Sequence, residues 1–272
     1  MQVLVTEVTG KTGSIVYRKL QQEQDIRVMG LGRSPAKARE MFDSTADLFF
    51  GDITQPETIE AAFNNCQKLV ILTSASPKMV APPKPGERPE FEYPERGTPE
   101  LVDYHGQKNQ IDLALAAGVE HIVLVGQSHS AQSVARRDLA AIAACMGGTN
   151  ENHPLNSMGN GKILIWKRKA EEYLVNSGIN YTIIRAGGLL DLPGGKRKLL
   201  VGDRDELLNN PPPGVKTSIP RADVAETVVR ALQEPAALNK AFDLISNSEA
   251  DSQGQVTQDF AALFAPTTPA SF

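Results

Sequence analysis

The chain opens with a short apolar strand that leads through a glycine-containing loop into an amphipathic stretch. Residues 1–13 read MQVLVTEVTGKTG, and residues 14–20 continue with helical periodicity. A strand, a tight turn and a helix in this order present backbone N–H groups at a helix N-terminus, where phosphate binds favourably. Gly10 and Gly13 provide positions without a Cβ, as close approach of a phosphate requires. The opening therefore predicts a dinucleotide site.

Glu7 is the unusual residue of this loop. Phosphate-binding loops of this type usually begin with a further glycine, three residues before the position of Gly10. A carboxylate that points at the phosphates would repel them, whereas one that points away would mainly restrict the backbone. Both orientations are compatible with the sequence.

Short apolar runs alternate with amphipathic stretches along most of the chain. This pattern is typical of a parallel sheet with helices on both faces. Strands are expected at 3–6, 27–31, 47–50, 68–73, 121–125 and 181–185, and helices at 11–22, 36–41, 56–64, 99–117, 163–177 and 222–233. With right-handed crossovers, the order predicts an α/β fold with a doubly wound parallel sheet, the Rossmann arrangement.

The alternation changes after residue 185. We expect residues 1–272 to form a single domain in which 186–272 contribute a small substrate lobe over the cofactor cleft, with short strands near 198–201 and 241–245. The long segment 74–98 follows the fourth strand at its carboxyl end, where open α/β sheets bind ligands. A segment of this length predicts a functional lid, with disorder as the alternative.

Composition excludes several classes of function. The net charge of −4 and the pI near 5.7 argue against generic binding to nucleic acid or to anionic membranes. No apolar stretch approaches the roughly 20 residues that span a bilayer. Neither the two cysteines, Cys66 and Cys145, nor the four histidines follow a metal-binding spacing, so no metal site is expected. Without a leader pattern a cytoplasmic protein is expected, with a plastid location as the alternative if a leader has been removed.

The end of the second predicted strand indicates which dinucleotide is preferred. It reads GLGRS over residues 30–34, whereas an NAD-specific site would carry Asp or Glu there to accept hydrogen bonds from the ribose 2′-OH. Arg33 instead offers a planar cationic fork suited to a 2′-phosphate. The sequence therefore favours NADP(H) over NAD(H).

Together these motifs resemble the atypical short-chain dehydrogenase/reductase family, which includes NmrA-like proteins, and within it a plant subgroup of NAD(P)-binding proteins. The resemblance covers nearly the whole chain and is carried by the segments 72–78, 106–112, 146–150, 159–161, 166–171 and 181–191. It implies that the pyrophosphate is faced by Gly10, Lys11, Thr12 and Gly13. It also implies a 2′-phosphate at Arg33 and Ser34, adenine at Asp52 and Ile53, and the adenosine ribose beside Thr73, Ser74 and Ala75.

The catalytic residues of this family are only partly present. Active members commonly carry Tyr-x-x-x-Lys on the helix after the fifth strand, which places both side chains on one helix face. Here Lys167 matches the lysine and is expected at the nicotinamide ribose, but Ile163 stands at the tyrosine position. Residues 127–144 are additional to the family pattern. Their Ser128 and Ser130 could replace the family serine, although solvated hydroxyls are favoured.

The expected function is NADP(H) binding, with reduction of an unidentified small carbonyl-type or conjugated substrate as the reaction. The missing tyrosine supports an alternative, a non-catalytic NADP(H) sensor that responds to the redox state of the nicotinamide. A third reading is a domain that has lost cofactor affinity through Glu7. A small molecule is the expected partner, and the oligomeric state is left open.

Overall fold

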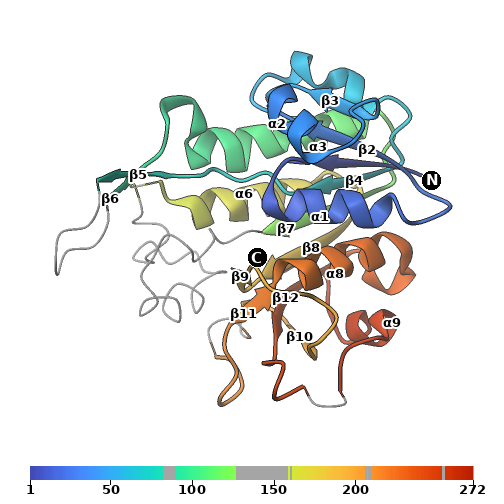
Figure 1. Cartoon of the computed structure of the whole chain (residues 1–272), viewed down its shortest axis with the longest axis vertical. Helices are drawn as coiled ribbons and strands as arrows, with labels where there is room; N and C mark the ends of the chain where they lie inside the picture. The colour runs from blue at the N-terminus through green and yellow to red at the C-terminus, as the bar shows by residue number, and fades with distance from the viewer. Residues whose placement is uncertain are drawn as a thin grey trace.

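The central element of the fold is a mostly parallel eight-stranded sheet (Figure 1). The computed structural model describes residues 1–81, 90–126, 159, 161–205, 207, 210–252 and 255–271. The strand order is β10-β12-β8-β7-β4-β1-β2-β3. Of the strand pairs described in this sheet, β10–β12 is antiparallel and the others are parallel. The strands are β1 (Gln2–Thr6), β2 (Arg27–Gly32), β3 (Leu48–Phe50), β4 (Lys68–Ile71), β7 (His121–Gly126), β8 (Asn180–Ala186), β10 (Leu199–Gly202) and β12 (Lys240–Ser246).

The order of these strands confirms the predicted doubly wound topology. The chain first builds outward from β1 to β2 and β3, and then crosses β1 to add β4, β7, β8 and β12 on its other side. The direction of winding therefore reverses between β1 and β4, which pair in parallel with Val3 opposite Lys68. In open α/β sheets the crevice at such a reversal, outside the carboxyl ends of the strands, is where ligands bind.

Helices cover both faces of the sheet because alternate strand residues point to opposite sides. On one face, α1 (Lys11–Leu20) and α8 (Arg221–Gln233) pack over a core that contains Val5 and Val125. On the other, α3 (Gln107–Ala116) and α6 (Ile163–Asn176) cover Leu4 and Ile71. The apolar runs are therefore buried from both sides, as the sequence pattern predicts.

Two predicted helices differ from α-helical geometry. Residues 56–64 form two 3-10 turns, η1 (Pro56–Thr58) and η2 (Glu60–Phe63). The Thr58 hydroxyl donates to the Gln55 carbonyl at 2.7 Å and accepts from the Asp52 N–H at 2.9 Å, so it competes with the helical hydrogen-bond ladder. The predicted helix 99–117 begins with a π-helical segment, η4 (Glu100–Gly106), before it continues as α3.

Residues 186–272 are more closely joined to the sheet than a covering lobe would be. The short strands expected near 198–201 and 241–245 are present, but β10 and β12 extend the central sheet. A separate parallel pair is formed by β9 (Gly188–Leu190) and β11 (Ser218–Pro220). Two short helices described in this region are η7 (Pro235–Ala237) and α9 (Phe260–Phe264).

The segment 74–98 contains regular structure on the side of the molecule opposite the N-terminus. Strands β5 (Lys78–Ala81) and β6 (Glu90–Glu92) form an antiparallel hairpin that projects from the body in Figure 1, followed by the 3-10 turn η3 (Glu95–Gly97). The described part of the segment 74–98 thus includes regular elements, and its role as a lid stays a prediction. The short helix α2 (Pro35–Met41) follows β2.

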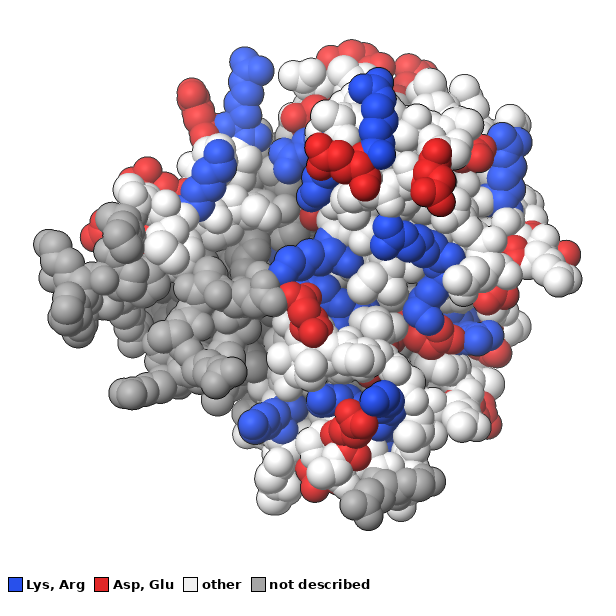
Figure 2. Space-filling view, viewed as in Figure 1, with Lys and Arg blue, Asp and Glu red and all other residues white. Residues whose placement is uncertain are grey.

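The face formed by α1 and α8 carries side chains of both signs side by side (Figure 2). Lys19 on α1 lies 2.7 Å from Glu226 on α8, and Arg230 contacts the same carboxylate at 2.8 Å. Within the described ranges, no helix is long and apolar enough to cross a membrane.

Candidate functional site

A cavity of about 630 Å³ lies at the carboxyl ends of β1, β2, β3 and β4, beside the reversal of winding. Each of these strands leads into a turn that contributes two or more lining residues. The lining includes most of the residues expected to bind cofactor, namely Gly10, Arg33, Ser34, Asp52, Ile53, Thr73, Ser74 and Ala75. The tertiary structure therefore brings these distant positions into one cavity.

Four other expected cofactor residues lie outside this lining: Lys11, Thr12, Gly13 and Lys167. The Lys11 ammonium is directed to Asp191, with 2.8 Å between Nζ and Oδ2. Asp191 also binds the Arg221 guanidinium, so it joins the N-terminal ends of α1 and α8. A contact of Lys11 with pyrophosphate stays a prediction that would require this side chain to leave Asp191.

The start of α1 has the features of a phosphate cradle. A Cβ on Gly13 would collide with the Glu7 carbonyl oxygen, and one on Gly10 would lie 2.7 Å from Glu7 Cγ. No side chain caps the helix at Gly10. The buried Thr12 hydroxyl has no hydrogen-bond partner among the described residues. Uncapped N–H groups and an unsatisfied hydroxyl at a helix N-terminus fit an anionic ligand.

Glu7 points into this cavity rather than away from it. Its backbone adopts φ of 54°, the left-handed conformation that a glycine at this position would adopt without strain. Its half-buried side chain lines the cavity and accepts a hydrogen bond from the Ser74 N–H. Burial raises the pKa of the Glu7 carboxyl to about 7, and the nearby cations Arg33 and Lys167 offset only part of that effect.

Basic side chains gather around the end of the cavity at which the adenosine is expected. Arg33 and Lys37 reach it from the end of β2 and from α2, and Lys78 and Arg96 from the segment 74–98. None of these four forms an ion pair within the part of the chain that the structure describes. Sequence reasoning missed the last three, although Lys37 lies one helical turn beyond Arg33. The cavity thus presents unpaired positive charge to a ligand.

Residues of α3 and of local turns hold the part of the cavity wall at which adenine is expected. Asp52 accepts from the N–H and hydroxyl of Thr54 at 2.9 and 2.8 Å, which fixes its carboxylate at the cavity wall. Asn109 donates to the Ile53 carbonyl at 2.9 Å. Thr73 is held through its carbonyl by Gln107 at 3.0 Å and through its hydroxyl by Gln110 at 3.1 Å.

Lys167 is buried in an ion pair that the sequence did not reveal. Its ammonium lies 2.6 Å from Asp103 Oδ1, and the second carboxylate oxygen of Asp103 accepts the Ala75 N–H at 3.0 Å. Asp103 connects the expected ribose-binding lysine to a cavity residue at the end of β4. The signal in the sequence that could have found Asp103 was an acidic residue on the inner side of the predicted helix 99–117.

The structure places no tyrosine at the family's catalytic position. Ile163 is buried in an apolar cluster with Leu164 and Ile245. The Tyr173 hydroxyl donates to Asp112 at 2.5 Å, and Tyr173 does not line the cavity. Ser128 and Ser130, which could replace the family serine, lie outside the described residues, as do His129, His153 and Cys145.

Neither of the described histidines lines the cavity. His105 is exposed. His121 is buried beside Thr182, with 2.9 Å between Nε2 and the hydroxyl, and burial lowers its pKa to about 3. In the described ranges, no three His, Cys, Asp or Glu side chains gather in a way that could hold a metal ion.

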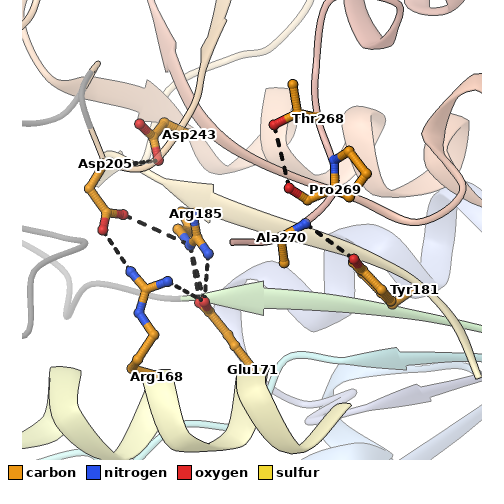
Figure 3. A network of polar contacts seen from close by, with 9 residues as sticks. All are labelled: Arg168, Glu171, Tyr181, Arg185, Asp205, Asp243, Thr268, Pro269 and Ala270. Carbon is orange, nitrogen blue, oxygen red and sulfur yellow. Dashed lines mark hydrogen bonds and ion pairs between the residues drawn. The ribbon is translucent and has the colours of Figure 1, made fainter. Parts of the chain in front are cut away.

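A buried network of charges extends from α6 to the end of β8 (Figure 3). Arg185 donates to Glu171 at 2.8 Å, and Arg168 donates to Asp205 at 2.7 Å. Asp243, the partner of Arg185 in the β8–β12 register, accepts the Asp205 N–H at 3.2 Å. Burial, reinforced by Asp205, raises the pKa of Asp243 to about 7. Arg185 thus pairs with the buried carboxylates of Glu171 and Asp205.

Comparison with known proteins identifies the relatives of this chain. The profile of a family described as NAD(P)H-binding matches residues 8–235. An uncharacterised chloroplastic protein of Arabidopsis thaliana is 49% identical over 98% of this chain and 76% of its own length. Sanguinarine reductase of Eschscholzia californica is 43% identical over 98% of this chain and 96% of its own length. A Rossmann-fold NAD(P)-binding protein of Shigella flexneri has a similar fold, with a TM-score of 0.59, 15% identity, and coverage of 95% of this chain and 96% of its own.

Proposed function

We propose that this chain, which belongs to the NAD(P)H-binding family, uses NADP(H) in preference to NAD(H) and reduces a small carbonyl-type or conjugated substrate. The observation that carries the cofactor preference is the position of Arg33 at the end of β2, inside the cavity and exposed to a ligand. A guanidinium there can bind a 2′-phosphate in a bidentate manner.

The surroundings of Arg33 support this preference. Ser34 lies beside it in the cavity wall, and Lys37 adds a second cation from α2. An acid that would accept the 2′-OH of NAD is absent from residues 30–34 at the end of β2. Asp52 comes from the turn after β3, and its Oδ1 is already engaged by Thr54. The charge at this wall therefore favours the ligand with the additional phosphate.

Two observations support a reductase. Sanguinarine reductase, a protein named for this type of reaction, aligns with this chain over almost the full length of both. When bound, the nicotinamide supplies or accepts the hydride. Lys167, held by Asp103 beside Ala75, is the residue we expect to orient the nicotinamide ribose. The proton would come from water or from a group outside the described residues.

Titration calorimetry with NADPH and NADH tests the cofactor preference directly. We expect NADPH to bind at least about tenfold more tightly, since a charge-assisted contact with one phosphate contributes about 1.5–3 kcal/mol. Equal affinities, or tighter binding of NADH, would contradict the proposal.

The buried Ile163 supports a second candidate function, a sensor that binds NADP(H) without turnover. The two candidates separate when NADPH oxidation is followed with a panel of quinones, aldehydes and enones. Oxidation that depends on the protein supports the reductase. Tight NADPH binding without oxidation of any panel member supports the sensor.

The relatives also bear on location. The 49% identical Arabidopsis protein is chloroplastic by name. This supports the plastid alternative over the cytoplasm for the present chain, and a fluorescent fusion to the complete gene product tests it.

A further inference from the structure

We propose that the Glu7 carboxyl must be protonated when a nucleotide phosphate occupies the cavity, so that cofactor binding takes up a proton from solvent wherever Glu7 is ionised in the free protein. This inference rests on the proposed function, because it requires an anionic cofactor at the start of α1. It assigns to Glu7 a role in binding that a glycine at the same position would not have.

The backbone holds Glu7 at the phosphate cradle. The Gly10 N–H donates to the Glu7 carbonyl at 2.8 Å, and the next residue, Val8, donates its N–H to the Leu31 carbonyl at 3.0 Å. The Glu7 carboxylate lies against Gly10, since a Cβ added there would be 2.7 Å from Oε1. A phosphate bound at the N-terminus of α1 would therefore lie close to this carboxyl.

Nothing in the described structure neutralises Glu7 directly. Although cations lie near it, Glu7 forms no ion pair within 4.0 Å in the described part of the chain. Lys167 on α6 is already paired with Asp103 on η4, and Arg33 extends from the end of β2. The Ser74 N–H after β4 is the hydrogen-bond donor to the carboxyl.

The other charged groups that line the cavity do not neutralise the Glu7 carboxyl either. Lys37, Lys78 and Arg96 line its outer parts, and Asp52 adds a negative charge on the adenine side. The balance of these surroundings raises the pKa of Glu7 from 4.5 to about 7, with burial as the largest cause. A nearby phosphate adds like charge and raises this pKa further. The protonated carboxyl can then donate a hydrogen bond to a phosphate oxygen, whereas the carboxylate can only accept.

The proposal predicts the direction in which cofactor affinity changes with pH. If the cofactor binds only the protonated form, its apparent dissociation constant rises with pH once the pH exceeds the pKa of Glu7 in the free protein. With that pKa about 7, affinity should fall about tenfold between about pH 6 and about pH 8. Proton uptake should approach one per cofactor at the upper end of this range.

Calorimetric titration of NADPH tests the proposal. The wild type, Glu7→Gln and Glu60→Gln are compared at each pH in two buffers of different ionisation enthalpy, which gives the number of protons taken up. Glu7→Gln mimics the protonated carboxyl, so it should lack this proton uptake and bind NADPH at about pH 8 about tenfold more tightly than the wild type. Glu60 is exposed on η2 and outside the cavity lining, so Glu60→Gln should behave as the wild type. The 2′-phosphate also titrates near this range, and it contributes equally to all three proteins.

The outcomes separate this inference from the proposed function. If the wild type and Glu7→Gln both bind NADPH with the same pH dependence and proton uptake, cofactor binding stands and the role of Glu7 is overturned. If neither binds at any pH, both proposals fail. Should Glu7→Gln not fold, Glu7→Gly supplies the same comparison, because it also removes the carboxyl and suits the positive φ.

Discussion

Asp103 and Lys167 form a buried ion pair, with 2.6 Å between Oδ1 and Nζ, that joins the π-helical segment η4 to α6. Asp103 is fully buried, and its other oxygen accepts the Ala75 N–H. One carboxylate therefore holds both the lysine expected at the nicotinamide ribose and the backbone expected beside the adenosine ribose. π-helical turns within longer helices are frequent at functional sites. Here the turn contributes the acid that positions Lys167.

Removal of one partner of this pair should destabilise the protein strongly. Asp103→Asn leaves the Lys167 ammonium buried without a counterion, which we expect to cost about 3–5 kcal/mol of unfolding free energy. The double variant Asp103→Leu with Lys167→Met should lose less unfolding free energy than the two single variants Asp103→Leu and Lys167→Met lose together, since it leaves no buried charge unpaired. Urea unfolding measures all of these variants.

The pair of Arg27 and Asp47 provides the control. It is exposed, with 3.2 Å between Nη2 and Oδ1, so Asp47→Asn should cost less than about 1 kcal/mol. Additive effects of Asp103→Leu and Lys167→Met would show that the buried pair is not coupled in solution.

Arg33 should determine the discrimination between the two cofactors. Arg33→Ala should weaken NADPH binding by about 10- to 100-fold and change NADH binding little, because only NADPH carries the phosphate that the guanidinium binds. Arg39 is an exposed arginine on α2, the helix that begins shortly after Arg33, and it lies outside the cavity lining. Arg39→Ala is therefore the matched control. If Arg33→Ala lost the same affinity for NADPH and for NADH, Arg33 would not contact the 2′-phosphate.

Asp243 should make the free protein less stable as pH rises toward neutrality. Its carboxyl has an ordinary pKa of 3.8 and one of about 7 in the folded chain. Between these values the folded state holds a proton that the unfolded state has released, so the free energy of unfolding falls through this range and levels off above about pH 7.

Urea unfolding from about pH 5 to about pH 8 checks this dependence. The loss of stability over the range should be about 2 kcal/mol smaller in Asp243→Asn than in the wild type. The Asp243 carboxyl accepts the backbone N–H groups of Asp205 and Leu207, so an amide in its place lowers stability by itself. That cost is the same at every pH, and comparing how stability changes with pH therefore excludes it. Asp25 is exposed, and Asp25→Asn should retain the wild-type slope. Identical slopes in Asp243→Asn and the wild type would show that Asp243 is ionised throughout.

Local patterns in the sequence were sufficient for much of the architecture. Apolar runs at the right spacing predicted β1, β2, β3, β4, β7 and β8, because burial on both faces leaves a continuous hydrophobic signature. The glycines of the first loop and the identity of Arg33 located the cavity, since the ends of neighbouring parallel strands must meet at one edge. The resemblance to a known family added the adenine-side positions.

Contacts between residues far apart in the chain could not be predicted from local sequence patterns. Asp103 could be matched to Lys167, and Lys11 to Asp191, only after the strand order had placed their elements side by side. The same holds for Lys78 and Arg96, which reach the cavity from a segment whose sequence predicts only a loop. β12 lies in the central sheet because β8 offers it a free edge, a property of the assembled sheet rather than of residues 240–246.

The sequence by itself determined the class of fold, the cradle for a dinucleotide and the presence of Glu7 at a glycine position. Only the tertiary structure decided that the Glu7 carboxyl points into the cavity, and that burial there raises its pKa to about 7. The physical reason is that periodicity and backbone preference are local properties, which neighbouring residues encode. Burial and charge pairing depend on groups that only the folded chain brings within a few ångströms.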